Sequence, residues 1–306
     1  MEAFVHLFEV VLPVFLIAGV AALSQRWLKL DPRALSRATF YVFIPALIFD
    51  ALADADLGRS QVGPMTVALL IVTLLLLGLG WAVARALRLT AQRRGAFLSA
   101  VVMANVGNYG LPVVQMAFGT AGLVPAAIYL MLFNMLLIPL GIYLAAQGKT
   151  SVTGALRHVI TVPALYAAAL GVAFSLGRWS LPVPVMVAVR MLAQATNPVF
   201  LLILGVQLQG AVTSSWDKRM LPALASLVAL RLLVSPGLAW GVGGWVGLHG
   251  LTFDVFVLDN AFPTAVLVGI FATEYDADPE FATLCIFVTT IVSLLTVPLV
   301  LGRIVG

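Results

Sequence analysis

The chain has 306 residues, of which 62% are hydrophobic and 10% are charged, and its mean hydropathy is +1.08. Soluble proteins carry about 25% charged residues, so this composition excludes a soluble globular protein. The formal net charge of +4 is no sign of nucleic acid binding, because the basic residues of a membrane protein gather in its cytoplasmic loops.

Apolar segments near the ~20 residues that cross ~30 Å of hydrocarbon recur along the whole chain. The first begins MEAFVHLFEVVLP and has no basic n-region, so we interpret it as a retained span rather than a cleaved signal peptide. We predict an all-α polytopic membrane protein with ten spans, near residues 5–24, 36–53, 64–87, 94–118, 121–146, 158–177, 183–211, 219–246, 253–276 and 280–303.

The basic residues of the connecting segments predict the orientation. With the N-terminus outside, the cytoplasmic segments hold Arg26, Lys29, Arg33, Arg37, Arg85, Arg88, Arg93, Arg94, Lys149, Arg157, Lys218 and Arg219, and the outer segments hold Arg59, Arg178 and Arg303. This positive-inside bias predicts that both termini are periplasmic. The remaining two, Arg190 and Arg231, fall inside predicted spans.

Prolines recur at a nearly fixed offset, which indicates an internal repeat. The pairs are Pro13 and Pro163, Pro45 and Pro198, Pro112 and Pro263, and Pro139 and Pro298. Two halves of five spans each, residues 1–150 and 151–306, must lie in the membrane with opposite orientations because five is odd. Inverted repeats of this kind are typical of secondary transporters, whose sites lie at the midplane.

Spans four and nine carry equivalent interruptions, NVGNYGLP at residues 105–112 and DNAFPTAVL at residues 259–267. A proline leaves the carbonyl four residues earlier without its donor, and these carbonyls belong to Asn108 and Asp259. We predict that Pro112 and Pro263 each begin a second half-helix, at the position where a missing N–H costs nothing. The alternative is that both are packing kinks, since proline is common in membrane helices.

Inversion of the halves brings the two half-helix N-termini to one centre from opposite sides. Each presents free N–H groups and about half a positive charge. The sequence therefore predicts an anion site that needs no basic residue.

The chain resembles the auxin efflux carrier family, including its bacterial organic-acid permeases. The resemblance rests on NVGNYGLPVVQMAFGTAG, LIPLGIYL, RLLVSP, AFPTAV with EYDAD, and TIVSLLTVPL, and it covers essentially the whole chain. Unlike the plant members, this chain has only about a dozen residues, near 147–158, after span five.

The resemblance implies the fold of the bile-acid/sodium symporters. Spans 1, 2, 6 and 7 would form a scaffold that dimerises, and spans 3–5 and 8–10 a transport domain with crossing spans four and nine and elevator-type movement. The substrate-contacting candidates carried over by position are Asn105, Asn108, Pro112, Asn260, Pro263 and Thr264.

Two ionisable residues in the membrane are candidates for coupling. Arg231, near the middle of span eight, either contacts the substrate carboxylate or forms a structural pair with an acid such as Asp259. Burial and a nearby anion both favour the protonated form of a carboxyl group, so Asp259 would bind a proton together with the anion. If Arg231 instead holds Asp259 ionised, the protein is a uniporter.

We therefore expect a secondary transporter of small organic anions, such as mono- or dicarboxylates, in the bacterial inner membrane. The alternatives are a sodium-coupled organic anion symporter and an anion-binding receptor that transports nothing. Enzyme motifs such as HExxH and GxSxG do not occur in the sequence, and the one cysteine, Cys285, and scattered histidines predict neither a metal centre nor a cofactor.

Overall fold

The computed structural model describes residues 2–53, 61–146, 163–212 and 218–305. In these ranges the chain is helical, apart from short connections and one isolated β-bridge. The predicted all-α fold is therefore confirmed. The loop near 147–158 and Arg59 lie outside the described residues.

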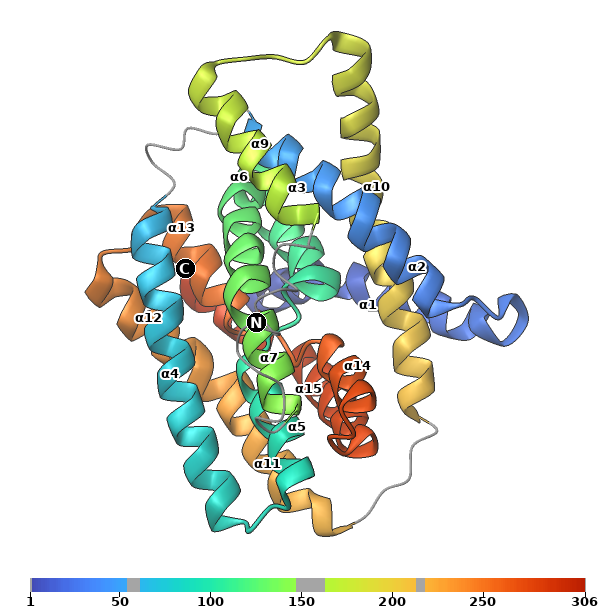
Figure 1. Ribbon diagram of the computed structural model, residues 1–306, viewed down its shortest axis with the longest axis vertical. Helices are drawn as coiled ribbons and strands as arrows, with labels where there is room; N and C mark the ends of the chain where they lie inside the picture. Colours follow the sequence, from blue (N-terminus) through green and yellow to red (C-terminus); the bar gives the residue numbers. More distant parts are fainter. Residues whose placement is uncertain (1, 54–60, 147–162, 213–217, 306) are drawn as a thin grey trace.

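The helices follow one another with few long connections (Figure 1). The first half contains α1 (Glu2–Leu28), α2 (Pro32–Ala38), η1 (Thr39–Phe43), α3 (Ile44–Ala53), α4 (Val62–Ala86), α5 (Ala91–Val102), η3 (Val106–Gly110), α6 (Leu111–Leu132), η4 (Phe133–Leu137) and α7 (Ile138–Ala145). The second half contains α9 (Pro163–Gly177), α10 (Val183–Val212), η5 (Lys218–Met220), α11 (Leu221–Ala229), η6 (Leu230–Val234), α12 (Ser235–Val246), α13 (Gly250–Asp259), α14 (Leu267–Glu274) and α15 (Pro279–Val305). The segments η1, η3, η4 and η6 are π-helical, and η5 is a 3₁₀ turn.

Several helical stretches are long and apolar enough to cross a membrane. They are Val62–Ala86, Val106–Ala145, Val183–Val206, Leu221–Val246 and Pro279–Val305, and shorter apolar helices cover Leu16–Gln25, Tyr41–Ala53 and Tyr166–Gly177. The 40-residue stretch Val106–Ala145 bends at Gly119, whose backbone is not helical (φ 64°, ψ −158°). This bend lies at the boundary predicted between spans four and five. The described helices are those of a polytopic membrane protein, and the count of ten spans stays a prediction.

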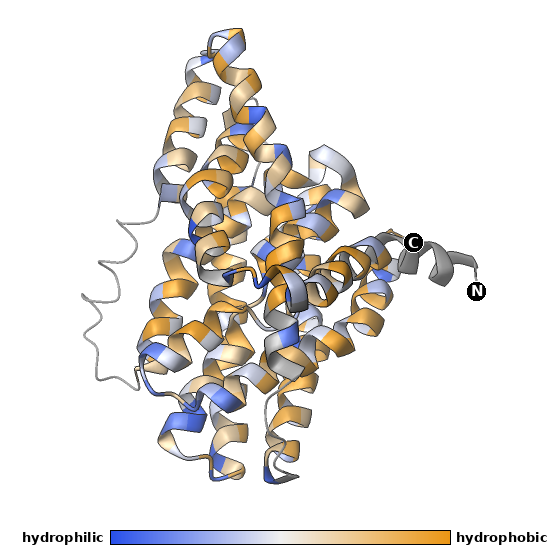
Figure 2. Cartoon of the chain, turned by 90° about the vertical axis from the view of Figure 1, so that its right-hand side faces the viewer, coloured by the Kyte–Doolittle hydropathy of each residue, from blue (hydrophilic) through white to orange (hydrophobic). Residues whose placement is uncertain are grey.

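Hydrophobic residues run along most of the helices (Figure 2). On α4, Leu74 is 66% exposed, and on α12 Trp245 is 79% exposed. Side chains of this kind are expected on a surface that faces lipid tails. The interior holds fully buried aromatic rings, among them Tyr109, Tyr129, Phe256 and Phe262.

Two sets of helices can be followed through their packing contacts. In the first, α1 packs mainly against α10, and α3 packs against α9 and α10. In the second, α4 packs against α5 and α12, α5 against α7, and α14 against α15 (Figure 1). Contacts between α1 and α15 and between α3 and α6 connect the groups, and the division into scaffold and transport domain stays a prediction.

Contacts between loops join segments that the charge pattern places on the same side of the membrane. At the end predicted to be cytoplasmic, Arg93 Nε donates to Asp278 Oδ2 at 2.8 Å. At the end predicted to be outside, Gln61 Nε2 donates to the His249 carbonyl at 3.1 Å, and the His249 N–H donates to Gln61 Oε1 at 3.0 Å. Both pairings are consistent with the predicted topology, which stays a prediction.

Labelling of single cysteines should establish the sidedness. In a Cys285→Ala background, a cysteine at His249 should react with a membrane-impermeant maleimide added to whole cells. A cysteine at Asp276 should react only after the membrane is opened, because its loop adjoins Arg93. Labelling of both positions from outside would contradict the inverted arrangement.

Candidate functional site at the crossing of two interrupted helices

Two extended segments cross and pair where predicted spans four and nine are interrupted. The first lies between α5 and η3, and the second lies between α13 and α14. Ala104 and Thr264 form an antiparallel bridge, flanked by hydrogen bonds from the Asn105 N–H to the Pro263 carbonyl (2.7 Å) and from the Ala265 N–H to the Met103 carbonyl (2.8 Å). Each segment thereby satisfies backbone groups of the other, as irregular backbone at membrane depth requires.

The two prolines do not hold equivalent places in this crossing. Pro112 lies in the first turn of α6, but η3 precedes it, so helical backbone begins at Val106. Pro263 lies in the extended segment immediately before Thr264, and α14 begins only at Leu267. The prediction that each proline begins a half-helix is therefore wrong for Pro263, whereas Pro112 does lie at the start of α6, with the π-helical η3 before it. The cause is local: a turn of η3 separates the bridge from Pro112, so the proline offset does not align the two interruptions.

Arg231 holds the C-terminal ends of both first half-helices. Its side chain is 1% exposed. Nη1 donates to the carbonyl of Val101 in the last turn of α5 (3.0 Å), and Nη2 donates to the carbonyl of Asn260, which caps α13 (2.5 Å). Ser235 Oγ also donates to the Asn260 carbonyl (2.9 Å) and accepts from Nη2 (2.6 Å). Carbonyls at helix C-termini have no partner within the helix, and here a buried cation supplies one.

Asp259 is not the partner of Arg231. The carboxyl group is 1% exposed, and Oδ2 has no hydrogen-bond partner among the described residues. The ion pairs of the described residues include Arg93 with Asp278 and Arg190 with Asp50 but none between Arg231 and Asp259. The structural pair considered from the sequence is therefore wrong, because backbone carbonyls, rather than an acid, surround the guanidinium.

Thr264 and Asn260 are also bound to the backbone. Thr264 Oγ1 donates to the Ala100 carbonyl at 3.1 Å, and the Thr264 N–H donates to Thr289 Oγ1 at 3.1 Å. Asn260 Nδ2 donates to the carbonyl of Phe256, four residues earlier, at 2.9 Å. Both side chains thus complete the ends of interrupted helices.

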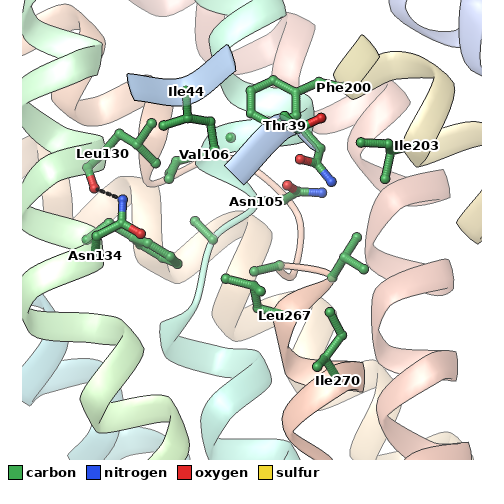
Figure 3. Close-up of a pocket in the computed structure, with 16 residues that line it drawn as sticks. Thr39, Ile44, Asn105, Val106, Leu130, Asn134, Phe200, Ile203, Leu267 and Ile270 are labelled. Carbon is green, nitrogen blue, oxygen red and sulfur yellow. Dashed lines mark hydrogen bonds between the residues drawn. The ribbon is translucent and has the colours of Figure 1, made fainter. Parts of the chain in front are cut away.

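A cavity of about 110 Å³ adjoins the crossing. One wall is formed by residues 104–108 of the first interruption and by 265–267 with Ile270 of the second. The facing wall comes from Thr39 of η1, Ile44 of α3, and Phe200 and Ile203 of α10, and Leu130, Phe133 and Asn134 complete the lining. Figure 3 shows the Asn105 side chain of the first wall near Thr39 and Phe200 of the facing wall. A cavity needs roughly 10–15 Å³ of such volume for one water molecule, so this one is large enough for several waters or for a small molecule.

The predicted contact residues fall into two sets. Asn105 and Asn108 line the cavity, whereas Pro112, Asn260, Pro263 and Thr264 do not. Sequence reasoning missed Asn134, whose Nδ2 donates to the Leu130 carbonyl at 2.7 Å (Figure 3). A signal for it existed, since Asn134 is a lone amide in an otherwise apolar fifth span.

The polar groups at the cavity come from amide side chains and from the backbone at two helix starts. Asn105 is 4% exposed, and its Nδ2 has no hydrogen-bond partner among the described residues. Gly107 and Asn108 lie in the first turn after the first interruption, and Leu267 begins α14. N–H groups in a first helical turn have no earlier turn to donate to. Within the described residues, no charged side chain lines the cavity, so its potential comes from amides and helix ends.

Comparison with known proteins identifies the family of this chain. A family model described as "Membrane transport protein" matches residues 6–301. An uncharacterised transporter of Methanothermobacter thermautotrophicus is 33% identical over 88% of each chain, and one of Methanocaldococcus jannaschii is 25% identical over 95% of this chain and 96% of its own. A probable auxin efflux carrier component of rice (Oryza sativa) is 27% identical over 45% of this chain and 25% of its own. These relatives are transporters rather than enzymes. The chain belongs to the membrane transport protein family, the family of the auxin efflux carriers.

Proposed function

We propose that this membrane transporter carries small organic anions with a carboxylate group. The observation that supports the proposal most directly concerns Asn105, which lines the cavity beside the crossing. Its Nδ2 is buried and donates no hydrogen bond to any described group. A buried donor without a partner costs about 1–3 kcal/mol. A ligand with acceptor oxygens removes that cost, and a carboxylate offers two such oxygens.

The helix ends favour a single negative charge. Helical backbone starts at Val106 after the first interruption and at Leu267 after the second, and both residues line the cavity. Each N-terminus carries about half a positive charge, so together they match about one carboxylate. Because no basic side chain of the described residues lines the cavity, an anion bound here is not held by an ion pair with them and can leave again.

The two walls of the cavity suggest how the anion crosses the membrane. Thr39, Ile44, Phe200 and Ile203 come from elements that pack with one another around α10. The interrupted segments connect α5 with η3 and α13 with α14, and η3 packs against both α6 and α10. If the interrupted segments move past the elements around α10, an anion bound to them is carried from one side of the membrane to the other. The proposal thus includes an elevator-type alternating access mechanism, a homodimer formed through α1, α3, α9 and α10, and a place in a bacterial inner membrane with both termini periplasmic.

A comparison of acids with their amides tests this proposal. The detergent-purified protein is titrated with a panel of small carboxylates and the matching neutral amides, and the thermal shift is recorded. Two helix ends at about 1 kcal/mol each predict a roughly 30-fold preference for the acid. Equal shifts for acid and amide throughout the panel would contradict an anion site. Loss of carboxylate binding in the Asn105→Asp variant would show that the carboxylate binds in this cavity.

A further inference from the structure

Arg231 lies in the middle of a membrane-spanning helix, where a charge is expensive and usually functional. It belongs to η6, a π-helical turn between α11 and α12. π-Helical turns within α-helices occur frequently at functional sites. Arg231 is not among the residues that line the cavity, so the proposed anion site does not explain its charge.

The surroundings of the guanidinium are those of a cation site. Its two Nη atoms bind carbonyls at the ends of α5 and α13, which belong to opposite halves of the chain. Each helix C-terminus carries about half a negative charge, and the two together are balanced by the one positive charge of Arg231. Asp259 forms no ion pair with Arg231 in the described structure. The C-terminal ends of α5 and α13 therefore supply the negative charge that balances the guanidinium.

In secondary transporters, carbonyls at half-helix C-termini and in unwound backbone are the groups that coordinate coupling cations. Here the corresponding carbonyls of Val101 and Asn260 are occupied by a cation that is part of the protein. We propose that Arg231 is a tethered cation that holds the two interrupted helices together at the crossing and removes the need for a bound metal cation there. Arg231 is in this sense a positioning residue, because it fixes the interrupted segments without lining the cavity.

Chemical rescue tests the proposal without any substrate, so its result does not depend on the cargo. Arg231→Ala should lower the melting temperature of the purified protein by several degrees and leave a cavity of guanidinium shape. Low-millimolar guanidinium chloride should restore much of this loss in a saturable way and should leave the wild-type protein unchanged. Urea has the same shape and no charge, and it should restore nothing. Sodium chloride at equal concentration shows whether a metal cation can take the same place.

Two further variants separate charge from packing if Arg231→Ala is too unstable to purify. Arg231→Lys keeps the charge but loses the fork, whereas Arg231→Gln keeps polar atoms and loses the charge. Folded protein recovered from membranes should decrease in the order wild type, Lys, Gln. Ser235→Ala, which removes a neutral partner of the Asn260 carbonyl, should have a smaller effect than either. Rescue by urea as good as by guanidinium, or recovery of Arg231→Gln equal to that of Arg231→Lys, would overturn the proposal.

Discussion

Substitution of Asn105 by aspartate should abolish carboxylate binding and uptake. The side chains have the same shape, but aspartate replaces the unpaired donor by an oxygen that repels an anion. The measurement is made at alkaline pH, where the new carboxyl group is ionised. Two unit charges 4 Å apart then repel by about 4 kcal/mol at an effective dielectric constant of 20, which is roughly a thousandfold in affinity. Thermal-shift titration and uptake by proteoliposomes measure the two effects.

Asn197→Asp is the matched control. Asn197 is 7% exposed, lies in α10 and does not line the cavity; its Nδ2 donates to Gln115 Oε1. The Asn197→Asp variant therefore replaces a buried asparagine by aspartate, as Asn105→Asp does, but at a position outside the cavity. Folded Asn197→Asp should bind carboxylates as the wild-type protein does. Wild-type affinity in folded Asn105→Asp would exclude Asn105 from the site.

The interruptions themselves could be predicted from the sequence. Glycine, asparagine and proline within a few residues of an apolar run cannot continue a regular helix, and membrane depth allows such backbone only where protein or a cavity satisfies it. Asn105 and Asn108 followed from this argument, and both line the cavity. The unpaired Nδ2 of Asn105 is consistent with the expectation that an anion could bind without a basic residue.

The partners across the crossing could not be predicted, because they depend on register between distant segments. Pairing of Ala104 with Thr264 turns the Thr264 hydroxyl to the Ala100 carbonyl and away from the cavity. Nothing local to Arg231 shows that its charge meets two helix ends rather than Asp259. Phe200 contributes to the cavity from α10, a helix that continues through Pro198 without an interruption.

Asp259 is the ionisable residue of the crossing that no described cation pairs with. It ends α13 and is 1% exposed, and Oδ2 has no described partner. An isolated ionised carboxylate in such surroundings costs far more than a neutral acid. Ion pairing with Arg231 would have removed this cost, and its absence in the described structure favours proton coupling over a uniporter. We propose that Asp259 takes up a proton when an anion enters the cavity and releases it when the anion leaves.

Asp259→Asn should therefore retain carboxylate binding but lose accumulation driven by a pH gradient, because asparagine mimics the protonated acid permanently. One pH unit stores about 1.4 kcal/mol per proton, enough for a tenfold accumulation if one proton accompanies one anion. Symport of a proton with a monoanion moves no net charge, whereas the variant would move one negative charge and respond to a membrane potential by about 2.3 kcal/mol per 100 mV. Uptake by proteoliposomes under separately imposed pH and potassium gradients measures both changes.

Asp254→Asn, the same substitution at a half-buried position of α13, is the control and should keep the wild-type pH dependence. A folded Asp259→Asn protein that still accumulates its substrate tenfold per pH unit would rule out Asp259 as the coupling residue and leave transport driven by the anion's own gradient.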